Sequence, residues 1–416
     1  MYKTYSGKGV FDWAARTKRW LFDGSFIQCL DYSYSMNPKP IPTQPVSAQR
    51  GKIPLAKPIF DEEMKEAAIH ALQNERFVFG ESVYKFEEEF ARYCGTKFAV
   101  STASGTAALT LSLIALNVRG REVLTTPASF VASANVILHA NAVPKFADIS
   151  LRDYTIDPGK VVRSIDGRTA AIIPVHLYGF PATMPELCEA ASEHKIAVIE
   201  DACQSHGAMY DGRKVGSFGD VGCFSFFPSK NMTVAGDGGM AVTKDGTIAE
   251  TIASLRDCGR AKGSKYIHDK IGYTERLNTV QAAVGRVQLR RLDAWNESRR
   301  KIAATYDELL SDVDQVVTPP HGDAIATPVH HMYVLRCRQR DELREWLGQR
   351  GVETGVHYSL PIHLQPIYRE QFKYSEGSFP NSEELCRTAL SIPIYVGLTP
   401  DDQGFVSESI HEFYKR

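Results

Sequence analysis

The sequence predicts an α/β protein in which helices cover both faces of a mainly parallel sheet, followed by a smaller C-terminal α/β unit. Two observations lead to this fold class. From residue 53 onward, short apolar runs alternate with segments of helical period. A long helical pattern over 280–310 then precedes a shorter mixed region. A length of 416 residues suits a large domain with a smaller companion.

The expected elements follow one another in a regular order. Helical period marks 61–74 and 80–95, and a glycine ends the second of these segments. Strand and helix patterns then alternate at the spacing typical of a parallel sheet. The predicted strands cover 98–100, 122–125, 144–147, 170–175 and 196–200, and the predicted helices cover 105–116, 130–139 and 184–194.

The composition divides the chain into three parts. Residues 1–52 include the proline-rich stretch "NPKPIPTQPVSAQRG" and are expected to form a poorly ordered N-terminal arm. We expect 53–285 to form the large domain, which carries the ligand site. The remaining residues, 286–416, are expected to form the smaller C-terminal domain.

Charge and cysteine usage narrow the function. A net charge of −1 gives no basic field for nucleic acid or an anionic membrane. The eight cysteines are widely spaced and show no zinc-site pattern, so no metal is predicted. No apolar run has the length of a membrane span, and no secretory signal is seen at the N-terminus. We therefore expect a cytoplasmic protein that binds neither nucleic acid nor a membrane.

A first candidate site lies in "FAVSTASGTAALTLSL", where a strand runs into a helix. The free N–H groups of a helix start attract anions, and Ser104 and Thr106 add hydroxyl donors beside Gly105. The alternative is a plain serine or threonine N-cap. Ligands of parallel sheets bind at the carboxyl ends of strands, which is where this segment falls.

A second candidate lies in "KIAVIEDACQSHGA", which delivers Glu200 and Asp201 to a strand end. A carboxylate there could hold a metal, act as a base, or pair with a cationic ring nitrogen. A helix cap is the structural alternative. No further set of acidic or histidine residues at metal spacing follows, which argues against the metal.

The third candidate is Lys230 in "SFGDVGCFSFFPSKNMTVAGDGGM", between aromatic residues and glycines. A strand that ends in a turn with the lysine pointing outward is the ordinary interpretation. Lys230 together with Ser225, a strand-end carboxylate and an anion-ready helix forms a coherent set, however. Pyridoxal phosphate has an aldehyde, a basic ring nitrogen and a phosphate, and would use all of these groups.

From about residue 53 to the C-terminus, the chain resembles the sugar aminotransferases of the DegT/DnrJ/EryC1/StrS family, within the fold-type I pyridoxal-phosphate enzymes. The matching motifs occur in the family's order. They are "SGTAAL", "TTPASFVASAN", "PVHLYG", "EDACQSHGA", "FSFFPSKN", "GDGGM", "RLNTVQAAVG" and "HYSLPIHLQPIY".

The resemblance implies a role for each matching residue. Lys230 would form the Schiff base with pyridoxal phosphate, and Asp201 would pair with its pyridine nitrogen. Gln204 would lie near the phenolic oxygen of the cofactor. The phosphate would be held by Gly105, Thr106 and Ser225, with Ser104 as a further cofactor contact, and Phe130 would stack on the ring.

The resemblance also implies the reaction. Glutamate or glutamine would donate an amino group to a keto-sugar, nucleotide-linked in most of the family, in surface-polysaccharide or amino-sugar biosynthesis. A cyclitol ketone of the scyllo-inosose type remains an alternative acceptor. The candidates for lining the sugar site are His331, Tyr333, His357 and His363. A hydrogen-bonded structural role is the alternative for each of them.

The family's active site lies at the interface of a homodimer. The segment "GYTERLN" approaches the neighbouring subunit's phosphate, and the family asparagine there is Thr274 in this chain. Thr274 would donate through its hydroxyl, or Asn278 would take its place.

The same fold is compatible with two other functions. A pyridoxal-phosphate-dependent sugar dehydratase carries histidine in place of the lysine, so Lys230 argues against it. A non-catalytic ligand sensor usually adds a DNA-binding module, and 1–52 show no helix-turn-helix pattern.

Overall fold

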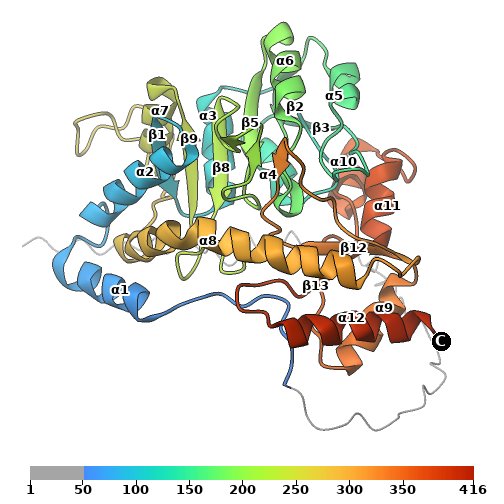
Figure 1. The fold of residues 1–416 in the computed structure, drawn as a ribbon. Helices are drawn as coiled ribbons and strands as arrows, with labels where there is room; N and C mark the ends of the chain where they lie inside the picture. Colours follow the sequence, from blue (N-terminus) through green and yellow to red (C-terminus); the bar gives the residue numbers. More distant parts are fainter. Residues whose placement is uncertain (1–50) are drawn as a thin grey trace, which may run out of the picture. The chain divides into compact units, whose positions relative to one another are not determined.

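The computed structural model describes residues 51–416, and the arm predicted over 1–52 lies almost entirely outside them. Within the described residues, a sheet of seven strands has the order β1-β9-β8-β5-β4-β2-β3 (Figure 1). The predicted fold class is confirmed. The strands are β1 (Phe98–Thr102), β2 (Glu122–Thr125), β3 (Val143–Phe146), β4 (Thr169–Ile173), β5 (Ala197–Asp201), β8 (Val221–Ser225) and β9 (Gly239–Thr243).

The direction of the strands decides where a ligand can bind. β9 pairs antiparallel with both β1 and β8, while β8, β5, β4, β2 and β3 pair in parallel. β1 therefore runs in the same direction as β8, and β9 alone is reversed within this sheet. The carboxyl ends of β1, β5 and β8 meet at one edge of the sheet, and β9 begins there.

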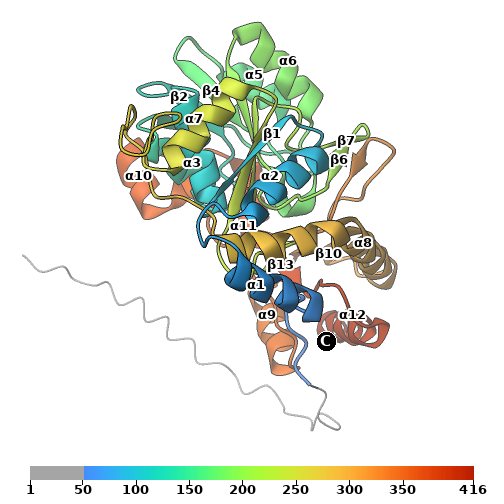
Figure 2. The same ribbon diagram turned by 90° about the vertical axis from the view of Figure 1, so that its left-hand side faces the viewer.

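Side chains alternate between the two faces of the sheet, as the strand pleat requires. Cys223 packs into a core with α3, α4 and α7, whereas the next residue, Phe224, packs into a core with α2 and α8. Figure 2 shows α2 and α8 on the same side of the sheet. The helices are α2 (Glu81–Cys94), α3 (Gly105–Ala115), α4 (Ala132–His139), α5 (Pro158–Ser164), α6 (Met184–His194), α7 (Gly246–Arg256) and α8 (Thr279–Leu309).

An aromatic cluster fixes β8 against α2. The ring of Phe90 contacts Phe224 edge-on at 5.0 Å and Phe226 at 5.5 Å between centroids. Phe86 contacts Phe226 at 5.3 Å. These four side chains are fully buried, so Phe224 and Phe226 belong to the core, whereas Phe227 is 50% exposed. Because they flank Ser225, the cluster also fixes the strand end that leads to the ligand edge.

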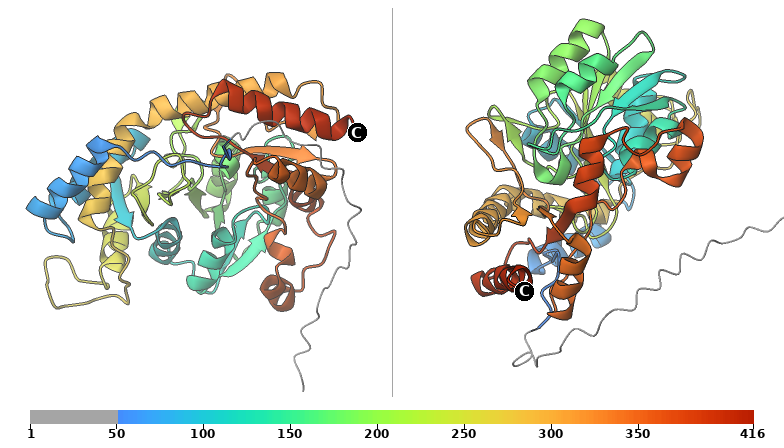
Figure 3. Two further views of the ribbon diagram at one scale, coloured as in Figure 1. Left: turned by 90° about the horizontal axis from the view of Figure 1, so that it is seen from below. Right: turned by 90° about the vertical axis from the view of Figure 1, so that its right-hand side faces the viewer.

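A second core lies at the C-terminal end. It joins part of α8 to a sheet in the order β10-β12-β13. Figure 3 shows α8 and α12 side by side. The elements of this region are β10 (Val316–Val317), β12 (Tyr333–Cys337), β13 (Ala389–Ile392), α9 (Arg340–Gln349), α10 (Pro366–Phe372), α11 (Pro380–Thr388) and α12 (Pro400–Tyr414).

The predicted boundary at residue 285 falls inside α8, which contributes side chains to the cores on both sides of it. Ile53 packs into the C-terminal core and bridges to Val352, so the described chain starts beside its own C-terminal part. The division into a large and a small domain stays a prediction.

The remaining elements lie outside these cores. α1 (Glu62–Asn74) packs along α8, and β6 (Met209–Tyr210), β7 (Arg213–Lys214) and β11 (Ala326–Thr327) form a small outer sheet.

No helix within residues 51–416 combines the length and the hydropathy that a membrane span requires.

Replacing Phe90 by alanine tests the aromatic cluster. We expect the free energy of unfolding to fall by about 3–5 kcal/mol, because the cavity left among Phe86, Phe224 and Phe226 cannot collapse fully. The midpoint of urea unfolding measures this loss. Glu88→Ala, on the exposed side of the same helix, should change the free energy by less than about 0.5 kcal/mol. Equal effects of the two substitutions would contradict the assignment.

Candidate active site

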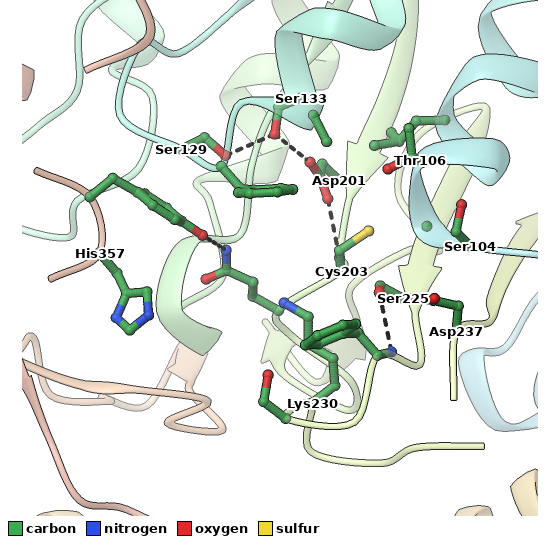
Figure 4. Close-up of a pocket in the computed structure, with 18 of the residues that line it drawn as sticks. Ser104, Thr106, Ser129, Ser133, Asp201, Cys203, Ser225, Lys230, Asp237 and His357 are labelled. Carbon is green, nitrogen blue, oxygen red and sulfur yellow. Dashed lines mark hydrogen bonds between the residues drawn. The ribbon is translucent and has the colours of Figure 1, made fainter. Parts of the chain in front are cut away.

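One cavity of about 440 Å³ opens at the carboxyl edge of the sheet (Figure 4). All of the residues predicted to contact the cofactor line it. They come from the turn after β1, the start of α4, the end of β5, the end of β8 and the loop that follows β8. These residues are Ser104, Gly105, Thr106, Phe130, Asp201, Gln204, Ser225 and Lys230.

The first turn of α3 forms one end of the cavity. Ser104 is its N-cap, and the Oγ of Ser104 accepts a hydrogen bond from the Ala107 N–H over 3.1 Å. The first N–H groups of a helix have no partner within the helix, so those of Gly105 and Thr106 are available to an anion. The hydroxyls of Thr106 and Ser225 face the same end of the cavity.

Gly105 is required by a close approach. A Cβ atom on it would lie 2.7 Å from the Ser225 Cβ and 2.7 Å from the Cys203 Sγ. No ordinary side chain fits in that space. The glycine therefore lets the start of α3 come against the end of β8, which forms the narrow cradle at this end of the cavity.

Asp201 forms the floor of the cavity and is only 5% exposed. The Oγ of Ser133 donates to its Oδ2 over 2.7 Å, and the Cys203 N–H donates to its Oδ1 over 3.2 Å. Ser129 Oγ lies 2.8 Å from Ser133 Oγ and extends this chain of hydroxyls. Each of the two carboxylate oxygens thus accepts a hydrogen bond, which holds the side chain in one orientation.

Glu200 has a structural role instead. Its carboxylate accepts hydrogen bonds from the backbone N–H groups of Gly216, Phe218 and Gly219. It also faces His176 Nε2 at 3.1 Å, in fully buried surroundings. The strand pleat thus sends the two adjacent carboxylates of β5 to different places, and only the second of them lines the cavity.

Gln204 and two aromatic rings form the side wall. Gln204 Oε1 accepts from the Tyr178 N–H over 2.8 Å, and its Nε2 lies 3.3 Å from the Tyr358 hydroxyl. The ring of Phe130 is 53% exposed and contacts the Tyr358 ring at 5.9 Å between centroids. An exposed phenyl ring over a cavity offers a flat apolar face to a planar ligand.

Lys230 points into the cavity from the loop after β8 (Figure 4). Its backbone N–H closes a turn with the Phe227 carbonyl over 2.8 Å. Its side chain lines the cavity, and Nζ lies 3.4 Å from the buried His331 Nε2, so the ordinary alternative of an outward-pointing lysine is wrong. Burial lowers the pKa of the Lys230 ammonium, while the Cys203 and Asp201 side chains oppose that shift. A lysine with a lowered pKa supplies more free amine near neutral pH than a surface lysine does.

One of the predicted sugar-site residues lines the cavity, and a second contacts Lys230. His357 lines the cavity and holds its Nδ1 2.8 Å from the Ser391 Oγ. His331 is only 4% exposed, and its Nε2 lies 3.4 Å from the Lys230 Nζ. His331 is therefore a buried neighbour of the Lys230 amine.

The expectation that Tyr333 and His363 line this cavity is corrected. Both side chains are fully buried elsewhere. The Tyr333 hydroxyl donates to Asp307 over 2.5 Å, and His363 Nε2 lies 3.0 Å from Glu383. Their motifs pointed to the right region, but strand alternation and local packing turned both side chains away from the ligand edge.

Thr274 and Asn278 do not line the cavity of their own chain. Thr274 Oγ1 lies 3.5 Å from the Cys258 Sγ, and Asn278 is the N-cap of α8, accepting from the Gln281 N–H over 2.9 Å. Their expected role toward a neighbouring subunit stays a prediction.

Sequence reasoning missed several lining residues. Ser129, Ser133 and Tyr358 stand inside motifs that were recognised, and the i, i+4 spacing of the two serines on a helix start was a usable signal. Asp237 also stands inside a recognised motif, "GDGGM", whereas Met332 gave no signal that separates it from its neighbours. The cavity thus combines an amine, a carboxylate at the opposite wall, an aromatic face and an anion-ready helix start.

Comparison with known proteins identifies the relatives of this chain. The sequence profile of the DegT/DnrJ/EryC1/StrS aminotransferase family matches residues 58–411. A Geobacillus stearothermophilus protein named "pleiotropic regulatory protein" is 40% identical over 85% of this chain and 95% of its own length. The dTDP-3-amino-3,4,6-trideoxy-alpha-D-glucose transaminase of Streptomyces venezuelae is 39% identical over 85% of this chain and 93% of its own length.

Solved structures agree with the sequence comparison. The S. venezuelae protein DesV, solved in complex with a ketimine intermediate, has a TM-score of 0.82 and 38% identity, covering 85% of this chain and 95% of its own. A putative sugar aminotransferase of Streptococcus pneumoniae, solved in its PLP form, has a TM-score of 0.83 over 88% of this chain and 99% of its own. At 22% identity, that second likeness shows the fold alone. The chain belongs to the DegT/DnrJ/EryC1/StrS aminotransferase family.

Proposed function

We propose that this aminotransferase uses pyridoxal phosphate to move an amino group from glutamate or glutamine to a nucleotide-linked keto-sugar. The single observation that supports it best is that Lys230 and Asp201 face one cavity whose far end is the start of α3. The relatives named as transaminases act on nucleotide sugars by their printed names, including a UDP-N-acetyl-3-dehydro-alpha-D-glucosamine aminotransferase. A place in amino-sugar or surface-polysaccharide biosynthesis follows from this acceptor class.

The residues at the cavity fit the cofactor. The cradle at Gly105 has no room for a side chain, which suits a phosphate held by backbone N–H groups and hydroxyls. Asp201 offers an acceptor that a protonated ring nitrogen would match. Phe130 offers an exposed ring face to a planar heterocycle. Lys230 offers the amine for covalent attachment.

When bound, pyridoxal phosphate supplies an electron sink that makes the Cα–H bond of an amino acid acidic. Asp201 would keep the ring nitrogen protonated, with Ser133 and the Cys203 N–H holding its oxygens in place. Lys230 Nζ, as a free amine, would take the proton from the donor's Cα. As an ammonium it would return a proton to the acceptor carbon.

A sensor function would use the same cavity without turnover, and the regulatory name of one relative raises that question. Glutamate-dependent amination of a keto-sugar nucleotide separates enzyme from sensor. Testing inosose beside keto-sugar nucleotides, with both amino donors, decides between sugar and cyclitol acceptors.

We also propose that the chain works as a homodimer with Thr274 or Asn278 near the neighbouring phosphate. Large apolar side chains that are exposed in one subunit support this proposal. They cluster in the α1–α2 region and in the segment before α8, with Ile271 at 92% exposure. They include Phe77, Tyr84, Tyr266 and Ile267.

A cytoplasmic location is proposed as well. It is supported by the seven cysteines of the described chain, which form no disulfide.

Replacing Lys230 by alanine should abolish covalent capture of the cofactor. Borohydride reduction followed by peptide mass analysis should find pyridoxyl on Lys230 in the unaltered protein and nowhere in the variant. The exposed Lys65, changed to alanine, is the matched control and should leave capture intact. Pyridoxyl still attached to another lysine of the Lys230→Ala protein at the same yield would refute the assignment.

The Asp201→Asn substitution should preserve binding of pyridoxal phosphate but slow turnover by about 10²-fold or more, because the ring nitrogen loses its charged partner. Cofactor binding is followed by visible absorption, and turnover by the amino donor assay. Asp211→Asn changes an exposed turn residue at positive φ, which asparagine tolerates, and should leave turnover unchanged. Near-normal turnover of Asp201→Asn removes this carboxylate from the mechanism.

Introducing charge at the proposed interface should weaken the dimer. If this side chain meets a second copy, the Ile271→Glu change buries an uncompensated carboxylate. We therefore expect the dissociation constant of the dimer to rise about tenfold or more. Sedimentation velocity at several protein concentrations measures it. Val162→Glu, an equally drastic change on the exposed side of α5, is the control. Unchanged association of Ile271→Glu would place the interface elsewhere.

A further inference from the structure

Three histidines of the described chain surround Lys230. Burial, and then the charge of Lys230, lower the pKa of His206 to about 3 and that of His357 to about 4. The same two causes lower the pKa of His331 well below its usual value. Within residues 51–416, His331 is the one whose ring makes a hydrogen-bond contact with the Lys230 amine, at 3.4 Å.

Contacts to the backbone of residues 330 and 331 fix the position of His331. Arg299, buried in α8, donates through Nη1 to the carbonyl oxygens of His330 and His331 over 3.2 and 3.4 Å. On the other side, a Cβ on Gly179 would lie 2.7 Å from the His331 N. Gly179 has a φ of +100°, so glycine is favoured there and lets the two segments touch. The ring is thereby held against the lysine.

When Lys230 is an ammonium, the contact requires a neutral imidazole. The Lys230 ammonium carries only donors, so its partner must offer a lone pair, which Nε2 has only when it carries no hydrogen. A protonated ring would bring two cations together in a buried place. Nδ1 then carries the hydrogen, and no partner for it is found among the described residues. The charged or titratable groups that act on His331 are Lys230, Arg299, His206 and His357.

We propose that His331 is a positioning residue for Lys230. Its Nε2 accepts an N–H of the lysine amine whenever the amine is not covalently engaged, and so keeps Nζ directed to one place in the cavity. The same hydrogen bond stabilises the ammonium form and offsets part of what burial does to it. This inference rests on the proposed function, and it replaces the expectation that His331 contacts the sugar.

The experiment uses the full chain freed of cofactor, with pyridoxal phosphate as the probe. The rate of covalent capture is measured from pH 5 to 10 by trapping the product with borohydride and determining the mass of the intact protein by mass spectrometry. The titration of pyridoxal phosphate itself is common to all the proteins, and the surrounding histidines stay neutral over this range. A difference in the profile between variants therefore reports deprotonation of Lys230. Three variants are compared: His331→Leu removes the acceptor, His331→Gln restores one near the place of Nε2, and His363→Gln alters a buried histidine outside the cavity.

For His331→Leu, the midpoint of the profile should move to lower pH by about one unit or more, because the ammonium loses a charged hydrogen bond. The rate on its plateau should fall about tenfold or more, because Nζ is no longer held. His331→Gln should recover both quantities to within about threefold. His363→Gln should match the unaltered protein.

The outcomes separate the two proposals. No capture by the unaltered protein refutes the proposed function itself. Normal capture with an unchanged profile in His331→Leu, or no recovery in His331→Gln, overturns the positioning role alone. If His331→Leu does not fold, ¹⁵N-histidine NMR of the unaltered protein and of Lys230→Met decides. The Nε2 resonance of His331 should shift when its donor is removed, and an unshifted resonance overturns the role equally.

Discussion

The site depends on a close contact between backbones at the carboxyl edge of the sheet. A Cβ on Gly239, the first residue of β9, would lie 2.3 Å from the Ser104 carbonyl oxygen, and one on Gly105 would meet Ser225. These two glycines let the turn after β1, the start of α3 and the ends of β8 and β9 occupy one small volume. Every group proposed to hold the phosphate bound by its own chain lies within that volume. Interiors are packed too densely for it to open without moving whole elements.

Polar groups around the cavity are unevenly distributed, and this has a chemical result. Asp201 accepts two hydrogen bonds, while Lys230 has a neutral imidazole as its neighbour. Donors thus hold both oxygens of the acid in place. The amine sits in surroundings that favour loss of its proton. One cavity therefore holds a fixed acceptor and an amine that gives up its proton more readily than a surface lysine does.

Much of this could be predicted from the sequence, because the informative patterns are local. The strand and helix periods located β1 to β5 and α3 to within about two residues, and recognised motifs located the cavity lining from Ser104 to Lys230. The reversed direction of β9 could not be seen, since strand order depends on contacts distant in sequence. Tyr333 and His363 were misplaced for a related reason. A motif fixes a segment, whereas the face that a side chain occupies depends on packing across the fold.

The clamp made by Arg299 has a consequence for protein engineering. Its guanidinium donates to carbonyl oxygens of residues 330 and 331 and to that of Ile394, and has no carboxylate partner among the described residues. Backbone carbonyl groups from two stretches that are distant in sequence thus solvate the buried guanidinium of Arg299, which belongs to a third stretch, α8. A chimaera that imports one of these stretches from a relative keeps the cation solvated only if the imported backbone presents its carbonyl oxygens in the same places. Recombination between family members should transplant the helix and both stretches as one block.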